Sequence, residues 1–105
     1  GVRHTRLISS RGNIVATARF YVDKSRNTGE LAIAVLDQWH NKGVGKAMLK
    51  ALVNAARELR IWTLEAHVLQ SNPFMIRLLH KAGLPSSGHA EDGAVRIVLD
   101  LREDR

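Results

Sequence analysis

The sequence predicts an α+β fold in which helices flank a mixed β-sheet. Three segments in the middle of the chain carry this prediction. Residues 31–36 form an unbroken apolar run, which is typical of a buried strand. From Val44 to Leu59, apolar residues recur every three or four positions, which indicates an amphipathic helix. Residues 61–69 are again largely apolar, and we interpret them as a second strand.

The first third of the chain predicts a β-hairpin. Its strands are residues 3–8 and 14–22, and residues 9–13 between them are rich in turn-forming types. A polar turn at residues 23–29 then leads into the strand at residues 31–36.

The last third predicts one more helix and one more strand. Ser71 or Asn72 caps the helix, Pro73 occupies its first turn, and Gly83 ends it. Residues 94–101 alternate enough to supply a final strand. The expected order is strand, strand, strand, helix, strand, helix, strand, in a single domain over residues 1–105.

Composition limits the class of protein. The 105 residues, 45% of them apolar, suffice for one core. No apolar run approaches a membrane span and residues 1–10 lack a secretion signal, so we expect no membrane partner and a cytoplasmic location. The absence of cysteine excludes disulfides, thiolate metal sites and a cysteinyl acyl-enzyme. The five histidines are scattered without the spacing of metal ligands, and we expect no metal.

A loop between the strand at residues 31–36 and the first helix predicts a phosphate-binding site. Gly43 and Gly45, with one residue between them, let the backbone come close to a ligand. The unpaired N–H groups of the helix's first turn and the positive end of its dipole favour an anion at the same place. We therefore interpret the loop as a diphosphate site.

Two common phosphate motifs do not match this loop. The nucleoside-triphosphate loop requires glycine where this chain has His40, and serine or threonine where it has Ala47. The dinucleotide fingerprint requires a third glycine at the position of Met48, and a tighter turn than residues 37–42 allow. Glu65 does lie at about the right distance for the ribose carboxylate of that fingerprint.

A third motif fits better. The loop resembles motif A of the GNAT superfamily of acetyl-CoA-dependent N-acetyltransferases, Arg/Gln-x-x-Gly-x-Gly/Ala. His40 stands at the first position of the motif, and Gly43 and Gly45 stand at the other two.

The sequence after the first helix agrees with this resemblance. Residues 72–84 resemble the superfamily's second signature, an Asn-led helix ending in Gly-Phe, here Gly-Leu. Together the matches span residues 29–84. Within the superfamily, the Trp39-centred turn, the junction at residues 68–72 and Glu30 most resemble the bacterial protein-lysine acetyltransferases.

The resemblance implies direct transfer of the acetyl group of acetyl-CoA to an amine, such as a protein lysine, in a ternary complex. A lysine amine is protonated at neutral pH, so a base is needed. Glu30 matches the position where the lysine acetyltransferases carry a glutamate that acts directly or through water. Backbone N–H groups near Ile33 and Val35 would polarise the acetyl carbonyl where the two central strands part. The residues implied for acetyl-CoA binding are Ile33, Val35, His40, Asn41, Lys42, Gly43, Val44, Gly45, Lys46 and Asn72.

The general acid of many superfamily members is absent. Those members carry a tyrosine on the last helix, at the position of Leu79 here. The protein-lysine acetyltransferases commonly lack it, so we expect the CoA thiolate to leave unprotonated. We interpret His80 as a surface residue, and Trp39 and Trp62 as packing residues.

The net charge of +6 fits either nucleic acid or anionic small molecules such as CoA phosphates. Lys42, Lys46 and Lys50 surround the start of the first helix, while the other basic residues are spread over strands and turns. The sequence contains neither a basic helix with base-reading spacing nor an aromatic-rich strand like that of an RNA-binding sheet. We therefore expect no nucleic-acid partner.

The resemblance also implies that part of the fold is missing. The superfamily's first strand and two following helices, which usually shape the acceptor site, have no counterpart in the 29 residues before Glu30. A catalytically silent CoA-binding or interaction module is therefore the alternative function. One sheet edge and one apolar face would be exposed, so we expect self-association or a longer parent chain with an N-terminal segment.

Overall fold

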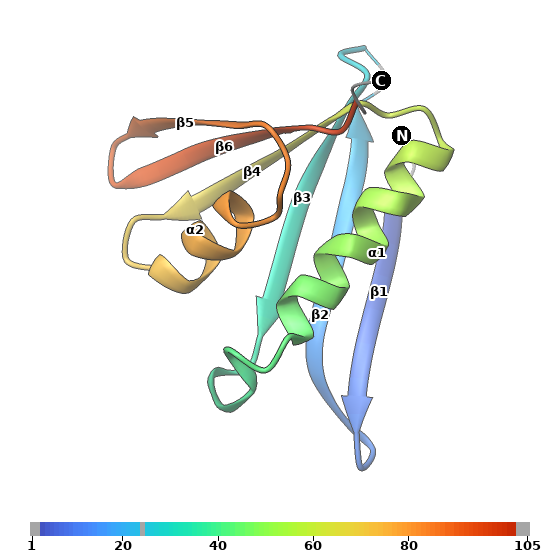
Figure 1. Cartoon of the computed structure of the whole chain (residues 1–105), viewed down its shortest axis with the longest axis vertical. Helices are drawn as coiled ribbons and strands as arrows, with labels where there is room; N and C mark the ends of the chain where they lie inside the picture. Colours follow the sequence, from blue (N-terminus) through green and yellow to red (C-terminus); the bar gives the residue numbers. More distant parts are fainter. Residues whose placement is uncertain (1–2, 24, 103–105) are drawn as a thin grey trace.

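The computed structural model describes residues 3–23 and 25–102 (Figure 1). Six strands form one sheet, and two helices pack on it. The elements are β1 (Arg3–Ser10), β2 (Asn13–Asp23), β3 (Thr28–Val35), a short 3₁₀ helix (Asp37–Trp39), α1 (Val44–Glu58), β4 (Thr63–Leu69), α2 (Pro73–His80), β5 (Ser86–Glu91) and β6 (Ala94–Asp100).

The sheet consists of two antiparallel halves joined by one parallel pair. The strand order is β1-β2-β3-β4-β6-β5, and only β3 and β4 run parallel. Their pairing covers three residue pairs, Thr28–Thr63, Gly29–Leu64 and Glu30–Glu65. Beyond these pairs the two strands diverge, so the sheet opens like a V (Figure 1).

Both helices lie on the same face of the sheet (Figure 1). The amphipathic helix α1 packs on β1, β2 and β3, and its buried residues follow the predicted apolar stripe. The helix face of the sheet is apolar because alternate strand residues point toward it. The largest fully buried side chains are Phe20, Leu52, Leu64, Leu79, Ile97, Leu99 and Leu101.

The opposite surface, here named the open face, has no helix over it in the described part of the chain (Figure 1). A Cβ placed on Gly29 would meet Leu64 and Phe20 on the helix side, so the neighbouring Glu30 points to the open face. Register then places the side chains of one further set on this face. That set is Arg3, Leu7, Arg19, Tyr21, Ala32, Glu65, His67 and Arg96.

The predicted strand order was wrong in one respect, because it omitted β5. All six residues of β5 are exposed, and the segment is made of small and polar types with no apolar alternation. Its pairing with β6 holds it in the sheet. The strand β3 also begins earlier than expected, at Thr28 within the predicted turn, because Thr28 and Gly29 are buried between β2 and β4.

Among residues 3–23 and 25–102, none of the helices has the length and apolarity needed to cross a membrane.

Candidate functional site

His40 shapes the loop that precedes α1. Its Nε2 lies 2.9 Å from the Val35 carbonyl oxygen, to which it donates when that nitrogen carries the proton. Its ring stacks on Phe74, with ring centroids 3.7 Å apart. The first residue of the glycine motif therefore links the end of β3 to α2. Lys42 instead lies over the ring of Trp39, 5.6 Å from its centroid.

Gly43 opens the N-terminus of α1 toward solvent. It adopts a left-handed conformation, with φ of 81°, and a Cβ there would meet nothing within 4 Å. No side chain caps this helix, and its first turn has no acidic residue. The backbone N–H groups of Val44, Gly45 and Lys46 therefore have no intrahelical acceptor and remain available to an anion.

Gly45 has a packing role that the sequence did not reveal. A Cβ at this position would lie 3.0 Å from a Leu78 methyl and 3.4 Å from the Phe74 ring. Glycine thus lets α1 and α2 come close together. The sequence predicted that a ligand approaches the backbone closely at both glycines. The open space at Gly43 is compatible with this prediction. At Gly45 it stays a prediction.

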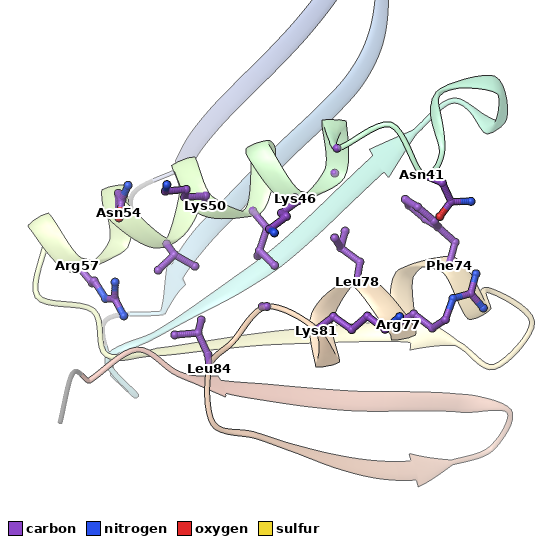
Figure 2. Close-up of a pocket in the computed structure, with 15 residues that line it drawn as sticks. Asn41, Lys46, Lys50, Asn54, Arg57, Phe74, Arg77, Leu78, Lys81 and Leu84 are labelled. Carbon is purple, nitrogen blue, oxygen red and sulfur yellow. The ribbon is translucent and has the colours of Figure 1, made fainter.

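A groove of about 700 Å³ runs between α1 and α2 (Figure 2). It extends from Asn41 and Gly43 at the glycine loop to Arg57 and Leu84 at its far end. Its walls combine apolar side chains with five cationic ones, and no acidic residue is among those that line it. The cationic residues are Lys46, Lys50, Arg57, Arg77 and Lys81. The groove therefore suits a ligand with several phosphates and an apolar part.

A second cavity, of about 200 Å³, lies where β3 and β4 part. Ile33 of β3, Ala66 and His67 of β4, Asn72, and Leu79 of α2 are among its lining residues. Leu79, which the resemblance aligns with the superfamily's tyrosine, brings no hydroxyl group. His67 is the one lining residue with an ionisable side chain.

Strand geometry directs two backbone N–H groups into this gap. The Leu36 N–H donates to the Val15 carbonyl of β2. Because successive N–H groups of a strand point to opposite sides, those of Val35 and Ile33 face the diverging β4 instead.

Glu30 lies just before the point where the strands part. It is exposed on the open face, and its Cα partners are Tyr21 on β2 and Glu65 on β4. It does not line the small cavity, which begins at the next residue, Leu31. Its assignment as the base stays a prediction.

Glu65 was not predicted as a site residue, yet it is the centre of a polar cluster with three partners. Its side chain is 5% exposed. Arg26 donates to it at 2.9 Å, His67 Nε2 lies 3.1 Å away, and Arg96 lies 3.7 Å away. Burial raises the pKa of this carboxyl, but the Arg26 hydrogen bond and the charges of Arg26 and Arg96 outweigh it, so the pKa is lowered.

The spacing of Glu65 and His67 could have revealed this cluster. Two polar residues two positions apart in a strand share one face of the sheet. From the sequence alone, Glu65 suggested only the ribose carboxylate of the dinucleotide fingerprint, which the loop does not match. Arg26 could not have been assigned, because it reaches Glu65 across 39 positions of sequence from the turn before β3.

Asn72 caps α2, since its side-chain oxygen accepts from the Met75 N–H at 3.2 Å. Asn72 also lines the small cavity, so its side-chain amide can cap the helix and contact a ligand in the cavity. In the described residues, no group of three or more His, Asp or Glu side chains is placed to hold a metal ion.

Sequence comparison identifies the family. Residues 3–84 match the profile of the acetyltransferase (GNAT) family. The chain belongs to this family. The match covers the diverging strands, the glycine loop and both helices, which are the elements that build the site. Comparison of this chain with curated protein sequences gave no match.

Solved GNAT structures share the fold. The GNAT domain of PAT from S. lividans is 29% identical, with a TM-score of 0.81 over 93% of this chain and 60% of that one. The acetyltransferase yncA from Salmonella typhimurium, solved with its cofactor acetyl-CoA, is 23% identical, with a TM-score of 0.75 over 95% and 65% of the two chains. A spermidine N-acetyltransferase SpeG variant from Vibrio cholerae is 14% identical, with a TM-score of 0.76 over 94% and 66%. This chain thus spans about 60–65% of the first two proteins.

Proposed function

We propose that this chain is an acyltransferase domain that transfers the acetyl group of acetyl-CoA to an amine. The observation that carries the proposal is the divergence of β3 and β4 after Glu30, which opens a cavity beside the glycine loop. Family membership supports it, because the superfamily uses this arrangement for acetyl-CoA.

The two ends of acetyl-CoA need different surroundings, and the chain offers both. The N–H groups of Val44, Gly45 and Lys46 would hold the diphosphate. Lys50 and Lys81 in the groove would face the remaining phosphate, and the apolar groove wall would contact the adenine. The acyl end would enter the small cavity between β3 and β4.

Bound acetyl-CoA supplies a thioester, and residues of the chain act on the acceptor. Glu30 takes a proton from the amine, through a water molecule since it lies outside the cavity lining. The neutral nitrogen forms a bond to the acetyl carbon while the N–H groups of Ile33 and Val35 stabilise the negative oxygen. The carbon–sulfur bond then breaks, and CoA leaves as the thiolate with no general acid at Leu79. The nitrogen, which became cationic when it attacked, releases its surplus proton to water, and the amide forms.

The acceptor that we propose is a protein lysine. The support is the resemblance of residues 29–84 to the protein-lysine acetyltransferases and the 29% identity to the PAT domain. The alternative is a catalytically silent CoA-binding module. It is supported by the position of Glu30, the proposed base, outside the cavity lining.

Ligand-induced stabilisation and turnover test the proposal separately. Acetyl-CoA should raise the melting temperature of the chain more than ATP or NAD at the same concentration, because only a ligand of the native state stabilises it. Mass spectrometry should then detect acetylation of a lysine peptide. A shift without turnover would establish the silent module, and a larger shift with ATP or NAD would refute the acetyl-CoA site.

A further inference from the structure

Two arginines, Arg19 and Arg96, flank the diverging strands on the open face. In the register, Arg19 of β2 lies opposite Ala32 of β3, and His67 of β4 lies opposite Arg96 of β6. These four residues form the row just past Glu30 and Glu65, where β3 and β4 have parted. Ala32 carries only a methyl group, so no long side chain stands between Arg19 and the gap.

Arg19 is the basic side chain of this region that has no assigned task. Arg26 and Arg96 are engaged with Glu65, and Arg3 lies over the Tyr21 ring, 6.0 Å from its centroid. Arg19 is exposed, and it has no hydrogen-bond, ion-pair or ring partner among residues 3–23 and 25–102. Its guanidinium is therefore available to a carboxylate from outside the chain.

We infer that the acceptor is a lysine in an acidic peptide segment, and that Arg19 binds a carboxylate two residues from that lysine. The inference rests on the proposed function, and it specifies the acceptor of that site. Glu30 and Ala32 are two residues apart on β3, which is about 7 Å, and Arg19 lies beside Ala32. An extended peptide over β3 spaces alternate side chains by the same distance, so a lysine near Glu30 places an acidic side chain near Arg19.

The surface around Arg19 also offers apolar side chains that a peptide can contact. Leu7 and Tyr21 lie on either side of it on the open face, 57% and 43% exposed. Exposed apolar side chains of this size suit contacts with neighbouring peptide residues. A polyamine such as spermidine would bring only positive charge beside Arg19, so it should be a poor acceptor.

Matched peptides test the inference on the full chain. Each carries a single lysine, with Asp, Asn or Arg placed two residues before it or two residues after it. In one of the two placements, the Asp peptide should exceed the Asn peptide by about 5–10-fold in kcat/KM, and the Arg peptide should be poorest. Arg19→Gln should remove the advantage of Asp, and Arg19→Lys should keep part of it.

The control is Arg6→Gln. Arg6 is an exposed arginine on β1 that lies opposite Ala18 and therefore points away from the open face. This variant should retain the Asp preference. Fluorescence anisotropy of the labelled peptides in the presence of CoA gives a readout that needs no turnover. Tighter binding of the Asp peptide that depends on Arg19 would support the binding of the acidic segment even if turnover is absent, and would then contradict the proposed function and not the role of Arg19. Equal binding of Asp and Asn peptides, or an Asp preference that survives Arg19→Gln, would overturn it.

Discussion

Glu30 and Glu65 are Cα partners across β3 and β4, yet their surroundings give them opposite tasks. Glu30 is exposed beside the gap, while Glu65 is buried among cationic partners and is held ionised. A base must exchange protons with the acceptor and then with solvent, which an ion-paired, buried carboxylate does poorly. Glu30 therefore remains the better candidate for the base.

The substitution Glu30→Gln should lower turnover about 10²-fold or more at neutral pH. The affinity for CoA should stay nearly constant, because the base acts on the acceptor proton and not on the diphosphate. Steady-state kinetics and calorimetric titration with CoA measure the two quantities. Unchanged turnover would remove Glu30 from the mechanism and direct attention to His67, which does line the cavity.

The substitution Glu65→Gln should act on stability. It removes the charge that Arg26, His67 and Arg96 share, and we expect the free energy of unfolding at neutral pH to fall by about 1–3 kcal/mol. Glu30→Gln is the matched control and should change it by less than about 0.5 kcal/mol, because that side chain is exposed.

The pH dependence of stability provides a second check on Glu65. Its pKa is lowered in the folded chain, so the unfolded state binds the proton more readily. The stabilisation is therefore complete above the ordinary carboxyl pKa and is lost as pH falls through the lowered one. Urea unfolding should show the difference between the parent chain and Glu65→Gln shrinking in acid. A difference that is independent of pH would mean that the carboxylate charge is not responsible.

At the scale of elements, the contact between α1 and α2 depends on Gly45. Gly45→Val should destabilise the chain by about 1–3 kcal/mol, because the added methyl groups would overlap the Leu78 side chain. The double variant with Leu78→Ala should regain part of this loss, which a double-mutant cycle in urea would measure. Gly88→Val on β5 is the control, since its nearest contacts are at 3.7 Å or more. Purely additive effects of the Gly45 and Leu78 substitutions would contradict the packing role.

Most elements could be predicted because their burial follows a simple period. The stripe of α1 and the apolar runs of β3 and β4 are one-sided or fully buried, and sequence periodicity records this directly. The strand β5 could not be predicted, because pairing with β6 and not burial places it in the sheet.

The candidate site was predictable only where it depends on local sequence. The loop with Gly43 and Gly45 and the Asn72 cap are local motifs, and each lies at the start of a helix as predicted. The Glu65 cluster and the fit of Gly45 against Leu78 depend on residues brought together from distant positions. The residue spacing within one segment does not reveal which distant residue contacts Glu65 or Gly45. These contacts could be found only in the structure.

At the scale of the whole molecule, cationic side chains occur at two places where the site would meet anionic molecules. One is the groove between α1 and α2, lined by five cationic side chains. The other is the part of the open face near Arg19. Separate basic regions for cosubstrate and acceptor would attract both anions without making them compete.

The last prediction concerns the surface of the sheet. The open face carries Leu7, Tyr21 and Leu69 at 57%, 43% and 65% exposure, and β1 is an unpaired edge that contains one of them. Unpaired edges and apolar side chains favour association, so we expect the 105-residue chain to self-associate as its concentration rises. Sedimentation velocity over a wide concentration range measures this. Leu7→Lys should reduce the association, because a charge on an edge strand opposes pairing with another sheet, whereas Leu59→Lys at the end of α1 should leave it unchanged. A monomer at every concentration would show that the open face and the β1 edge need no cover in solution.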